Sequence, residues 1–459
     1  MCSVPARWTA ATASGSPEAG FLRGLSPLAE ETRLIRAVGR WDLTALAING
    51  LIGSAIFGLP ASVAHLTGPW SPLACLFCGL ILLLVVFCFA EASSLFVGTG
   101  GPYLYAREAF GDLFGMAGGW MMWLARVTAF AANANLFVSF AGYFIPGLRL
   151  GIPRAGVLTA LVTILTWINI RGVKQGALLG DILAAAKLIP MFGFVAIGLF
   201  AVKPELFQGS AMPGRAEFGQ AVLLYLFAFT GFEYAAIPAG EAVSPRKHLP
   251  AAMLTASFTA CALFTGIQAV CVGTLPELSR SQTAMADAAA RFLGSAGGRI
   301  IALTAVVSIL GNLSGMALIS PRLTYALAKD GLLPSGLSAV HARYRTPHIS
   351  ILLYGLVTLG MALSGTFVGM VRISAVARIV PYALTCLAVP VLRRRYPAEA
   401  ERFRLRGGLV IPASACLVCL WLLWQSPWRD ALAAAGALAA GLLLYAGNRA
   451  WLRKSSSGN

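Results

Sequence analysis

Apolar runs alternate with short polar segments along almost the whole chain. A helix of roughly 20 apolar residues is long enough to cross the hydrocarbon core of a bilayer, which is about 30 Å thick. The pattern therefore predicts an all-α integral membrane protein with twelve transmembrane helices and no separate soluble domain. The helices are expected near residues 43–65, 70–92, 112–144, 155–171, 178–201, 217–240, 250–274, 298–328, 347–366, 370–392, 409–426 and 429–450.

The first predicted helix is interrupted in its middle by the segment Gly50–Pro60 (GLIGSAIFGLP). Glycine in a helix interior costs about 1 kcal/mol relative to alanine, and Pro60 has no N–H to donate to the preceding turn. In lipid, a broken helix persists only where protein or a water-filled cavity satisfies the freed backbone groups. The interruption therefore predicts one half of a binding site for a polar ligand.

The sixth predicted helix carries a matching interruption, Thr230-Gly231 followed by Pro238. A single Gly/Pro kink often serves helix packing alone. Paired interruptions at corresponding positions of two halves are the best sequence indication of a transporter's binding site. We therefore expect both interruptions to face one ligand.

The charges of the chain fit this topology. Lys and Arg number 35 against 18 Asp and Glu, a net charge of +17 that would suit a nucleic-acid partner. With the N-terminus inside, however, most of these cations fall in inner loops and at inner helix ends, the bias typical of plasma-membrane proteins. We expect a multi-pass protein of the plasma (inner) membrane with both termini cytoplasmic, no cleaved signal peptide and no nucleic-acid partner.

The nine cysteines indicate neither a disulfide framework nor a metal site. Two pairs have CxxC spacing, Cys75/Cys78 and Cys416/Cys419, but no histidine lies beside them. Most of the cysteines fall within the apolar spans, where they are expected to pack as small apolar residues. We expect no metal and no cofactor.

Six short motifs occur in order across about 45–395. They are Gly53–Phe57 (GSAIF), Gly100–Gly111 (GGPYLYAREAFG), Asn169–Lys174 (NIRGVK), Phe227–Glu233 (FAFTGFE), Ser244–Lys247 (SPRK) and Pro321–Gly331 (PRLTYALAKDG). Any one of them is weak by itself. Together they resemble the amino acid–polyamine–organocation (APC) family of permeases.

The resemblance implies ten helices in two inverted repeats of five, with helices 1 and 6 unwound at the membrane midplane, and two further helices. The chain is then divided into a cytoplasmic N-terminal segment (1–40), an inverted-repeat transport core (41–395), helices 11 and 12 (396–450) and a cytoplasmic tail (451–459).

The expected site follows from what an α-amino acid presents to the protein. Its carboxylate needs N–H donors at the N-terminus of a half-helix, where the helix dipole also favours negative charge. The backbone of Gly53, Ser54 and Ala55 offers such donors, and Ser54 adds a hydroxyl. A glycine is more usual in the family at the position of Ala55.

The family alignment supplies the rest of the site. The substrate ammonium would meet carbonyls of Leu51 in helix 1 and of Phe227 and Thr230 in helix 6, beside Gly231. By resemblance to relatives that bind arginine, the side-chain end of the site would contain a polar group on helix 3 and a tryptophan on helix 8. The matching positions here are Phe130 and Met316. Because both are apolar, we expect neutral and fairly apolar amino acids as substrates.

Coupling is assigned to two ionisable residues in the spans. By resemblance to proton-coupled and exchanging relatives, Lys187 in the fifth helix replaces a bound sodium ion and meets carbonyls freed at the helix 1 break. The alternative is that Lys187 caps those carbonyls in every state. Glu233 matches the acidic position of the family and either holds or relays a proton or satisfies freed backbone groups.

Other charged residues are given structural roles. Glu91 and Glu241 lie near inner helix ends and are expected to pair with Arg107 or Arg246 when a cytoplasmic gate closes. A buried or interfacial arginine is either paired or extends its head group to the membrane surface. The arginines placed in this class are Arg126, Arg372 and Arg378.

The function predicted is secondary active transport of amino acids by alternating access, through proton symport or exchange. The partners are the amino acid, protons and the bilayer. The alternative substrate class is cationic amino acids or polyamines. A membrane enzyme or a transporter-like receptor is the alternative of a different class, but the four histidines form no HExxH motif and no GxSxG or P-loop sequence occurs. We therefore expect no enzymatic activity.

Overall fold

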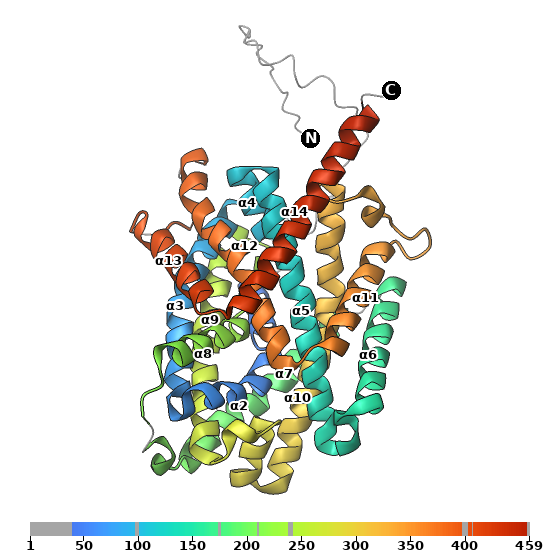
Figure 1. Ribbon diagram of the computed structural model, residues 1–459. Coiled ribbons are helices and arrows are strands. Elements are labelled where there is room, and N and C mark those ends of the chain that lie inside the picture. The colour runs from blue at the N-terminus through green and yellow to red at the C-terminus, as the bar shows by residue number, and fades with distance from the viewer. Residues whose placement is uncertain are drawn as a thin grey trace, which may run out of the picture. The chain divides into compact units, whose positions relative to one another are not determined.

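The computed structural model describes residues 39–96, 101–172, 176–208, 211–236, 242–396, 403–405 and 407–456. For residues 176–186, 236 and 454–456 it describes the backbone alone. The regular elements in these ranges are helices, arranged as Figure 1 shows. Gly39 precedes the first helix, and its N–H donates to Asp42 Oδ2 at 2.8 Å, which fixes the start of that helix.

The described residues of the first half of the chain form seven α-helices. They are α1 (Arg40–Leu51), α2 (Ala55–Thr67), α3 (Ser71–Leu95), α4 (Pro102–Phe110), α5 (Asp112–Phe144), α6 (Gly151–Arg171) and α7 (Gly176–Gly198). Short 3-10 helices connect or extend them: η2 (Gly68–Trp70), η3 (Pro146–Arg149), η4 (Leu199–Ala201) and η5 (Pro204–Phe207).

The second half begins with another interrupted helix. It contains α8 (Arg215–Ala228), η6 (Phe232–Ala236), α9 (Pro245–Thr274), η8 (Leu278–Arg280), α10 (Ala284–Lys329), η9 (Ser335–Ser338), α11 (His348–Ser364), α12 (Phe367–Arg395), α13 (Val410–Trp424) and α14 (Trp428–Ser456). The element α10 joins two helices across a kink at Gly294, where φ is 71° and the helix cannot continue.

Seven helical stretches among the described residues are long and apolar enough to cross a membrane. They are Ala55–Leu95, Asp112–Phe144, Gly151–Arg171, Pro245–Thr274, Ala284–Lys329, Phe367–Arg395 and Trp428–Arg453. Lys187–Ala201, His348–Ser364 and Val410–Trp424 are shorter apolar helices. Half-helices such as α1 and α8 fall below this length because the chain is interrupted where they end. The composition and length of these helices identify a multi-pass membrane protein.

The long helices bring the two interruptions together. Helix α5 packs along both α12 and α10, while α3 packs along α9 (Figure 1). Helix α1 packs against α9 and against η6, the short helix that follows the second interruption. The interior between them is filled by apolar side chains, with Phe57, Phe140 and Phe264 among those that are fully buried.

Candidate functional site

The first interruption lies at Ile52–Ser54, within the segment that the sequence indicated. Helix α1 ends at Leu51, and the N–H of Ile52 makes the last helical bond, to Ile48 O at 2.7 Å. The N–H of Gly53 then turns to Leu51 O at 2.9 Å, and α2 begins at Ala55. The first N–H groups of a helix have no acceptor one turn earlier. The start of α2 therefore presents free donors and the positive end of a dipole.

Lys187 from α7 reaches the carbonyls that this interruption frees. Its Nζ donates to Ile52 O at 2.5 Å and to Asn49 O at 3.1 Å, and the residue is only 4% exposed. These carbonyls are the partners that the sequence led us to expect. An ammonium group at this depth needs such partners, because a buried charge without a hydrogen-bonding partner is costly.

The second interruption lies between α8 and η6. The N–H of Thr230 bonds to Phe227 O at 3.3 Å, and the Thr230 hydroxyl donates to the same carbonyl at 2.8 Å. Gly231 follows with φ of 113°, a conformation that strongly favours glycine. Its N–H donates to Glu233 Oε2 at 2.9 Å. Glu233 thus satisfies a backbone group freed by the unwinding.

A buried ion pair fixes this segment to α12. The guanidinium of Arg378 donates to Glu233 Oε1 at 2.6 Å, and both side chains are 2% exposed. Tyr382, one turn further along α12, donates to the other carboxylate oxygen at 3.5 Å. Removing one member of a buried pair leaves an uncompensated charge. The pair therefore ties the conformation of the second interruption to the position of α12.

The two interruptions touch each other through glycines. A Cβ on Gly231 would lie 2.5 Å from the carbonyl carbon of Gly50, and a Cβ on Gly50 would lie 2.7 Å from Gly231 O. The ring of Tyr234 lies against Gly50 as well. Side chains larger than hydrogen do not fit in this contact, so the backbones of the two unwound segments lie directly against each other.

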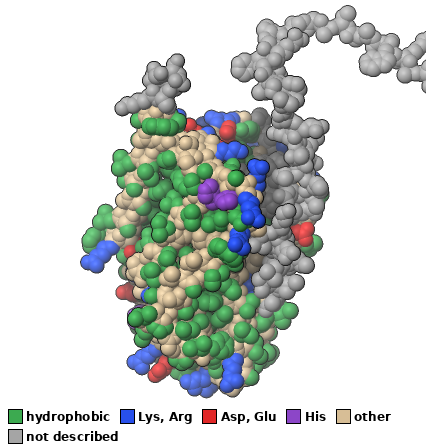
Figure 2. All heavy atoms as spheres, turned by 90° about the vertical axis from the view of Figure 1, so that its right-hand side faces the viewer, with side chains coloured by type: hydrophobic (Ala, Val, Ile, Leu, Met, Phe, Trp, Pro, Cys, Tyr) green, Lys and Arg blue, Asp and Glu red, His purple; other side chains and the backbone are tan. Residues whose placement is uncertain are grey.

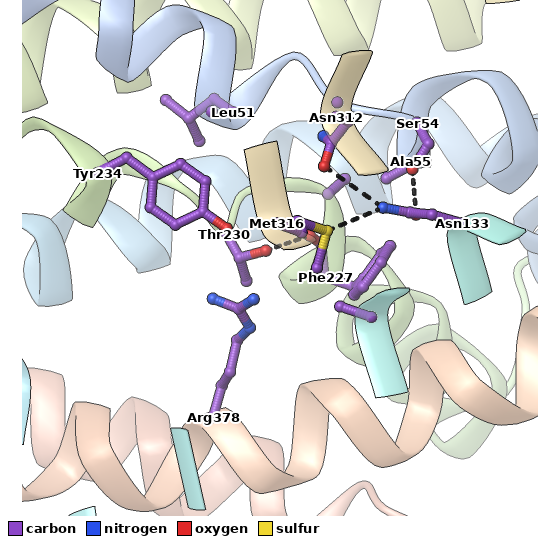
Figure 3. Close-up of a pocket in the computed structure, with 14 residues that line it drawn as sticks. Leu51, Ser54, Ala55, Asn133, Phe227, Thr230, Tyr234, Asn312, Met316 and Arg378 are labelled. Carbon is purple, nitrogen blue, oxygen red and sulfur yellow. Dashed lines mark hydrogen bonds between the residues drawn. The ribbon is translucent and has the colours of Figure 1, made fainter. Parts of the chain in front are cut away.

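A small cavity lies between the interruptions and the helices α5, α10 and α12, and Figure 3 shows it. Most of the predicted substrate-binding residues line it: Leu51, Gly53, Ser54, Ala55, Phe227, Thr230 and Met316. Gly231 lies at the glycine contact between the interruptions. The residues that the sequence did not single out for substrate are Gly50, Ala129, Asn133, Ala228, Tyr234, Asn312 and Arg378.

Two asparagines on different helices line the cavity, and the sequence analysis did not predict them. Asn133 of α5 accepts a hydrogen bond from the Ser54 hydroxyl. Its amide nitrogen lies 3.5 Å from Asn312 Oδ1 of α10 and 3.3 Å from the sulfur of Met316 (Figure 3). The sequence contained one indication of both residues, a side-chain amide in the middle of each apolar run. Polar groups inside membrane helices rarely lack a function.

Phe130 does not line this cavity, contrary to the expectation from the family alignment. Ala129 and Asn133 share the face of α5 that lines it, and Phe130 is rotated by about 100° from Ala129 on the helix. Phe130 instead lines a second small cavity and contacts Tyr354 of α11 edge-on, with 5.9 Å between ring centroids. The polar side chain that α5 presents to the main cavity is therefore Asn133, beside the small Ala129.

The other two intramembrane arginines also have partners. Arg372 lies 3.1 Å from Asp430 Oδ2 of α14. The guanidinium of Arg126 lies 5.9 Å from the centre of the Tyr234 ring. Arg378 differs from both because it lines the cavity, and its guanidinium extends toward Thr230 in Figure 3.

The charged residues expected at a gate pair differently from the prediction. Glu91 binds the fork of Arg393 with both oxygens, at 2.5 and 2.7 Å, and accepts the N–H of Leu405 at 3.1 Å. It therefore pairs with neither Arg107 nor Arg246, because α3 packs against α12, whose last turn carries Arg393. Glu241 lies outside the described residues.

Arg107 instead joins the start of α5 to the end of α10. It contacts Asp112 at 2.9 Å and Asp330 at 2.7 Å, and Tyr103 donates to Asp330 at 3.3 Å. Burial and the neighbouring Asp330 raise the pKa of Tyr103 to about 12. The phenol therefore remains a hydrogen-bond donor at neutral pH, and Asp330 at the end of α10 is held to α4.

Comparison with known proteins agrees with this architecture. A family model described as amino acid permease matches residues 38–435. The methylthioribose transporter of Bacillus subtilis is 27% identical over 443 residues, 92% of this chain and 95% of the relative. The branched-chain amino acid permease BcaP of the same species is 28% identical, over 90% of this chain and 93% of the relative. The serine/threonine exchanger SteT of that species is 29% identical, over 82% and 87%. The resemblance seen in the motifs is confirmed, and the chain belongs to the amino acid permease family.

Proposed function

We propose that this protein is a secondary active transporter that moves neutral amino acids across the plasma membrane by alternating access. The observation that carries the proposal is the cavity where the two interrupted helices meet. Half-helix ends and unwound backbone are how transporters bind small charged ligands near the midplane. In this proposal the chain forms twelve helices, ten of them in a 5+5 inverted repeat, and both termini are cytoplasmic.

The cavity suits the two charges that every α-amino acid carries. The substrate carboxylate would meet the first N–H groups of α2, at Ser54 and Ala55, with the positive end of the helix dipole behind them. The ammonium would meet the carbonyls at the ends of α1 and α8, where Leu51 and Phe227 line the cavity. The α-amino acid backbone therefore bridges the two interruptions.

The lining supports a neutral side chain over a cationic one. Arg378 is the one charged residue among the described residues that line the cavity, and it is paired with Glu233. Among the described lining residues, no carboxylate is thus presented to an arginine, lysine or polyamine substrate. The relatives named for branched-chain amino acids and for serine and threonine are consistent with neutral substrates.

The amides of Asn133 and Asn312 favour a second candidate within the same class. An apolar side chain that covers a buried amide leaves its polar atoms unpaired, at a cost of about 1–3 kcal/mol. A substrate hydroxyl would pair with them, because both amides lie at the cavity. Small hydroxyl-bearing amino acids are therefore candidates beside the apolar ones.

For coupling, we propose that Lys187 stands in for a bound cation at the first interruption. Its two carbonyl partners belong to the segment that changes direction there, so opening of the site would change their geometry. Transport would then be proton-coupled or exchanging and independent of sodium. Glu233 would hold the second interruption against α12, since protonating it would leave Arg378 buried without a counter-charge.

Uptake into proteoliposomes tests the proposal. The purified protein would be reconstituted and offered a panel of radiolabelled neutral, cationic and acidic amino acids, with and without internal substrate or a pH gradient. We expect uptake of neutral amino acids that leucine, valine or threonine inhibits more strongly than arginine or putrescine. Preferential uptake of arginine would refute the neutral substrate class. If the reconstituted protein neither binds nor takes up any amino acid of the panel, the proposed function is refuted.

A further inference from the structure

The loop between α10 and α11 ends in a compact turn that rests on the C-terminal end of α6. The turn is closed by the N–H of His341 bonding to Thr346 O at 2.8 Å and by the N–H of Arg345 bonding to His341 O at 2.9 Å. The Thr346 hydroxyl donates to Ile170 O, one of the last carbonyls of α6, at 2.7 Å. The turn and the end of α6 therefore form one surface.

Three exposed arginines, which we call the arginine cluster, belong to this surface: Arg171, Arg343 and Arg345. Arg171 is the last residue of α6, and its guanidinium stacks over the ring of Trp167 at 4.1 Å. Arg345 has φ of 55° and is the one non-glycine with positive φ among the described residues. Such a conformation is uncommon for a residue with a long side chain. The closed turn holds Arg345 in this conformation.

Within the described ranges, the arginine cluster lacks the acidic partners found elsewhere at this end of the helices. Arg107, Arg393, Arg395 and Arg449 each form an ion pair with a carboxylate. In the described part of the chain, no carboxylate forms an ion pair with any member of the cluster. Among the described residues, the cluster is therefore a positive patch without a counter-charge.

An apolar surface extends along the membrane-spanning helices beside this patch. Trp167 is 52% exposed on α6 and Leu356 is 72% exposed on α11, and these two helices pack against each other. Figure 2 views the side of the molecule on which Figure 1 places α6 and α11, and it shows histidines beside Lys and Arg above a largely hydrophobic surface. Tryptophan at such a boundary is typical of the membrane interface.

We propose that the arginine cluster binds the phosphate group of an anionic phospholipid whose acyl chains lie along the exposed faces of α6 and α11. Guanidinium groups present fork-shaped donors that match phosphate oxygens. Basic sites between membrane helices on the cytoplasmic side bind such head groups, and this end of the helices is the one that we place at the cytoplasmic surface. The alternative role for these cations is to orient the chain during membrane insertion, which requires no bound lipid afterwards.

Native mass spectrometry of the purified protein distinguishes the two roles. Phosphatidylglycerol and phosphatidylcholine would be titrated separately, and the fraction of protein that retains lipid would be measured. We expect the wild type to retain phosphatidylglycerol in preference to phosphatidylcholine. The retained fraction of phosphatidylglycerol should fall as the salt concentration is raised, since salt screens exposed charges. The variants are Arg171→Gln, Arg343→Gln and Arg345→Asn, the last because asparagine tolerates positive φ.

Each substitution should weaken phosphatidylglycerol binding by about fivefold, the effect of one cation at an anionic surface, and leave phosphatidylcholine binding unchanged. Arg394→Gln, at an exposed position at the end of α12, is the matched control and should retain the wild-type preference. An unchanged gel-filtration profile shows that each variant is folded, and Arg343→Gln alone decides if the other two variants aggregate.

Equal retention of the two lipids by the wild type would overturn the proposal. So would an equal loss in the Arg394→Gln control. Displacement of phosphatidylglycerol by equimolar glycerol 3-phosphate would show that the site binds a free phosphate and would also overturn it.

Discussion

Replacing Gly231 with alanine tests the contact between the two interrupted helices. The new Cβ would lie 2.5 Å from the carbonyl carbon of Gly50, whereas ordinary contacts begin at 3.4 Å. Both neighbours at this point are backbone, so no side chain can rotate away. The unwound segments would have to separate by about 1 Å, the difference between those two distances.

The size of the effect follows from the backbone as well as from the overlap. Gly231 has φ of 113°, and a non-glycine residue in such a sparsely populated region costs about 1–3 kcal/mol. The protein relieves this strain by moving the segments apart, which displaces the substrate's donors and acceptors. Restoring them on binding costs the same energy, so affinity should fall by about 5- to 150-fold.

The assay is binding of the preferred radiolabelled amino acid to the purified protein, with uptake by proteoliposomes as a second measurement. Gly315→Ala is the matched control, because it lies in α10 near the site and a Cβ there meets nothing within 4 Å. We expect the control to bind like the wild type. If Gly231→Ala also binds within twofold of the wild type, the two segments do not hold the substrate between them.

Three further predictions concern single side chains at the site. Ser54→Ala removes the hydroxyl bonded to the amide of α5, so affinity should fall by about 1 kcal/mol or somewhat more in isothermal titration; unchanged affinity would place the substrate elsewhere. Lys187→Ala should impair uptake while the yield of protein and its membrane insertion remain normal. Wild-type uptake should persist when choline replaces sodium, and a dependence on sodium would contradict the role of Lys187 as a built-in cation. Glu233→Gln leaves Arg378 buried without its counter-charge and should destabilise the protein by about 3–5 kcal/mol. Its melting temperature in detergent would then fall, and Glu233→Gln combined with Arg378→Met should recover part of the loss.

Both interruptions could be predicted from the sequence because the weak helix propensity at each position is a local property. Glycine beside serine or threonine within an apolar run is a poor helix former, and the chain leaves the helix at Ile52–Ser54 and again at Phe229–Gly231. The contact of Lys187 with freed carbonyls was predictable for a related reason. A buried ammonium needs acceptors, and an interrupted helix is where a membrane protein has them to spare.

The lining of the cavity depended on tertiary packing and was predicted only in part. Asn133 and Asn312 lie on different helices, and their convergence on Ser54 depends on how α5 and α10 rotate against α2. Phe130 lines the second cavity for the same reason, since a motif match does not fix which face of α5 meets the main cavity.

The partners of the charged residues at the helix ends could not be predicted either. Glu91 pairs with Arg393, which lies 302 positions away. Sequence order gives no ranking among the many basic residues at that end. The choice is made by the packing of α3 against α12, which only the folded structure defines.

The bonds from Lys187 to the first interruption also determine when that interruption can form. The carbonyls of Ile52 and Asn49 are bound by a residue that follows them by 135 and 138 positions. A nascent first helix surrounded by lipid has no such partner, and unsatisfied backbone groups are not tolerated there. The segment Arg40–Thr67 is therefore expected to insert as one continuous helix and to unwind at Ile52–Ser54 only when α7 docks against it. Unwinding is thus a late step of tertiary assembly, and a chain truncated before α7 should retain an uninterrupted first helix.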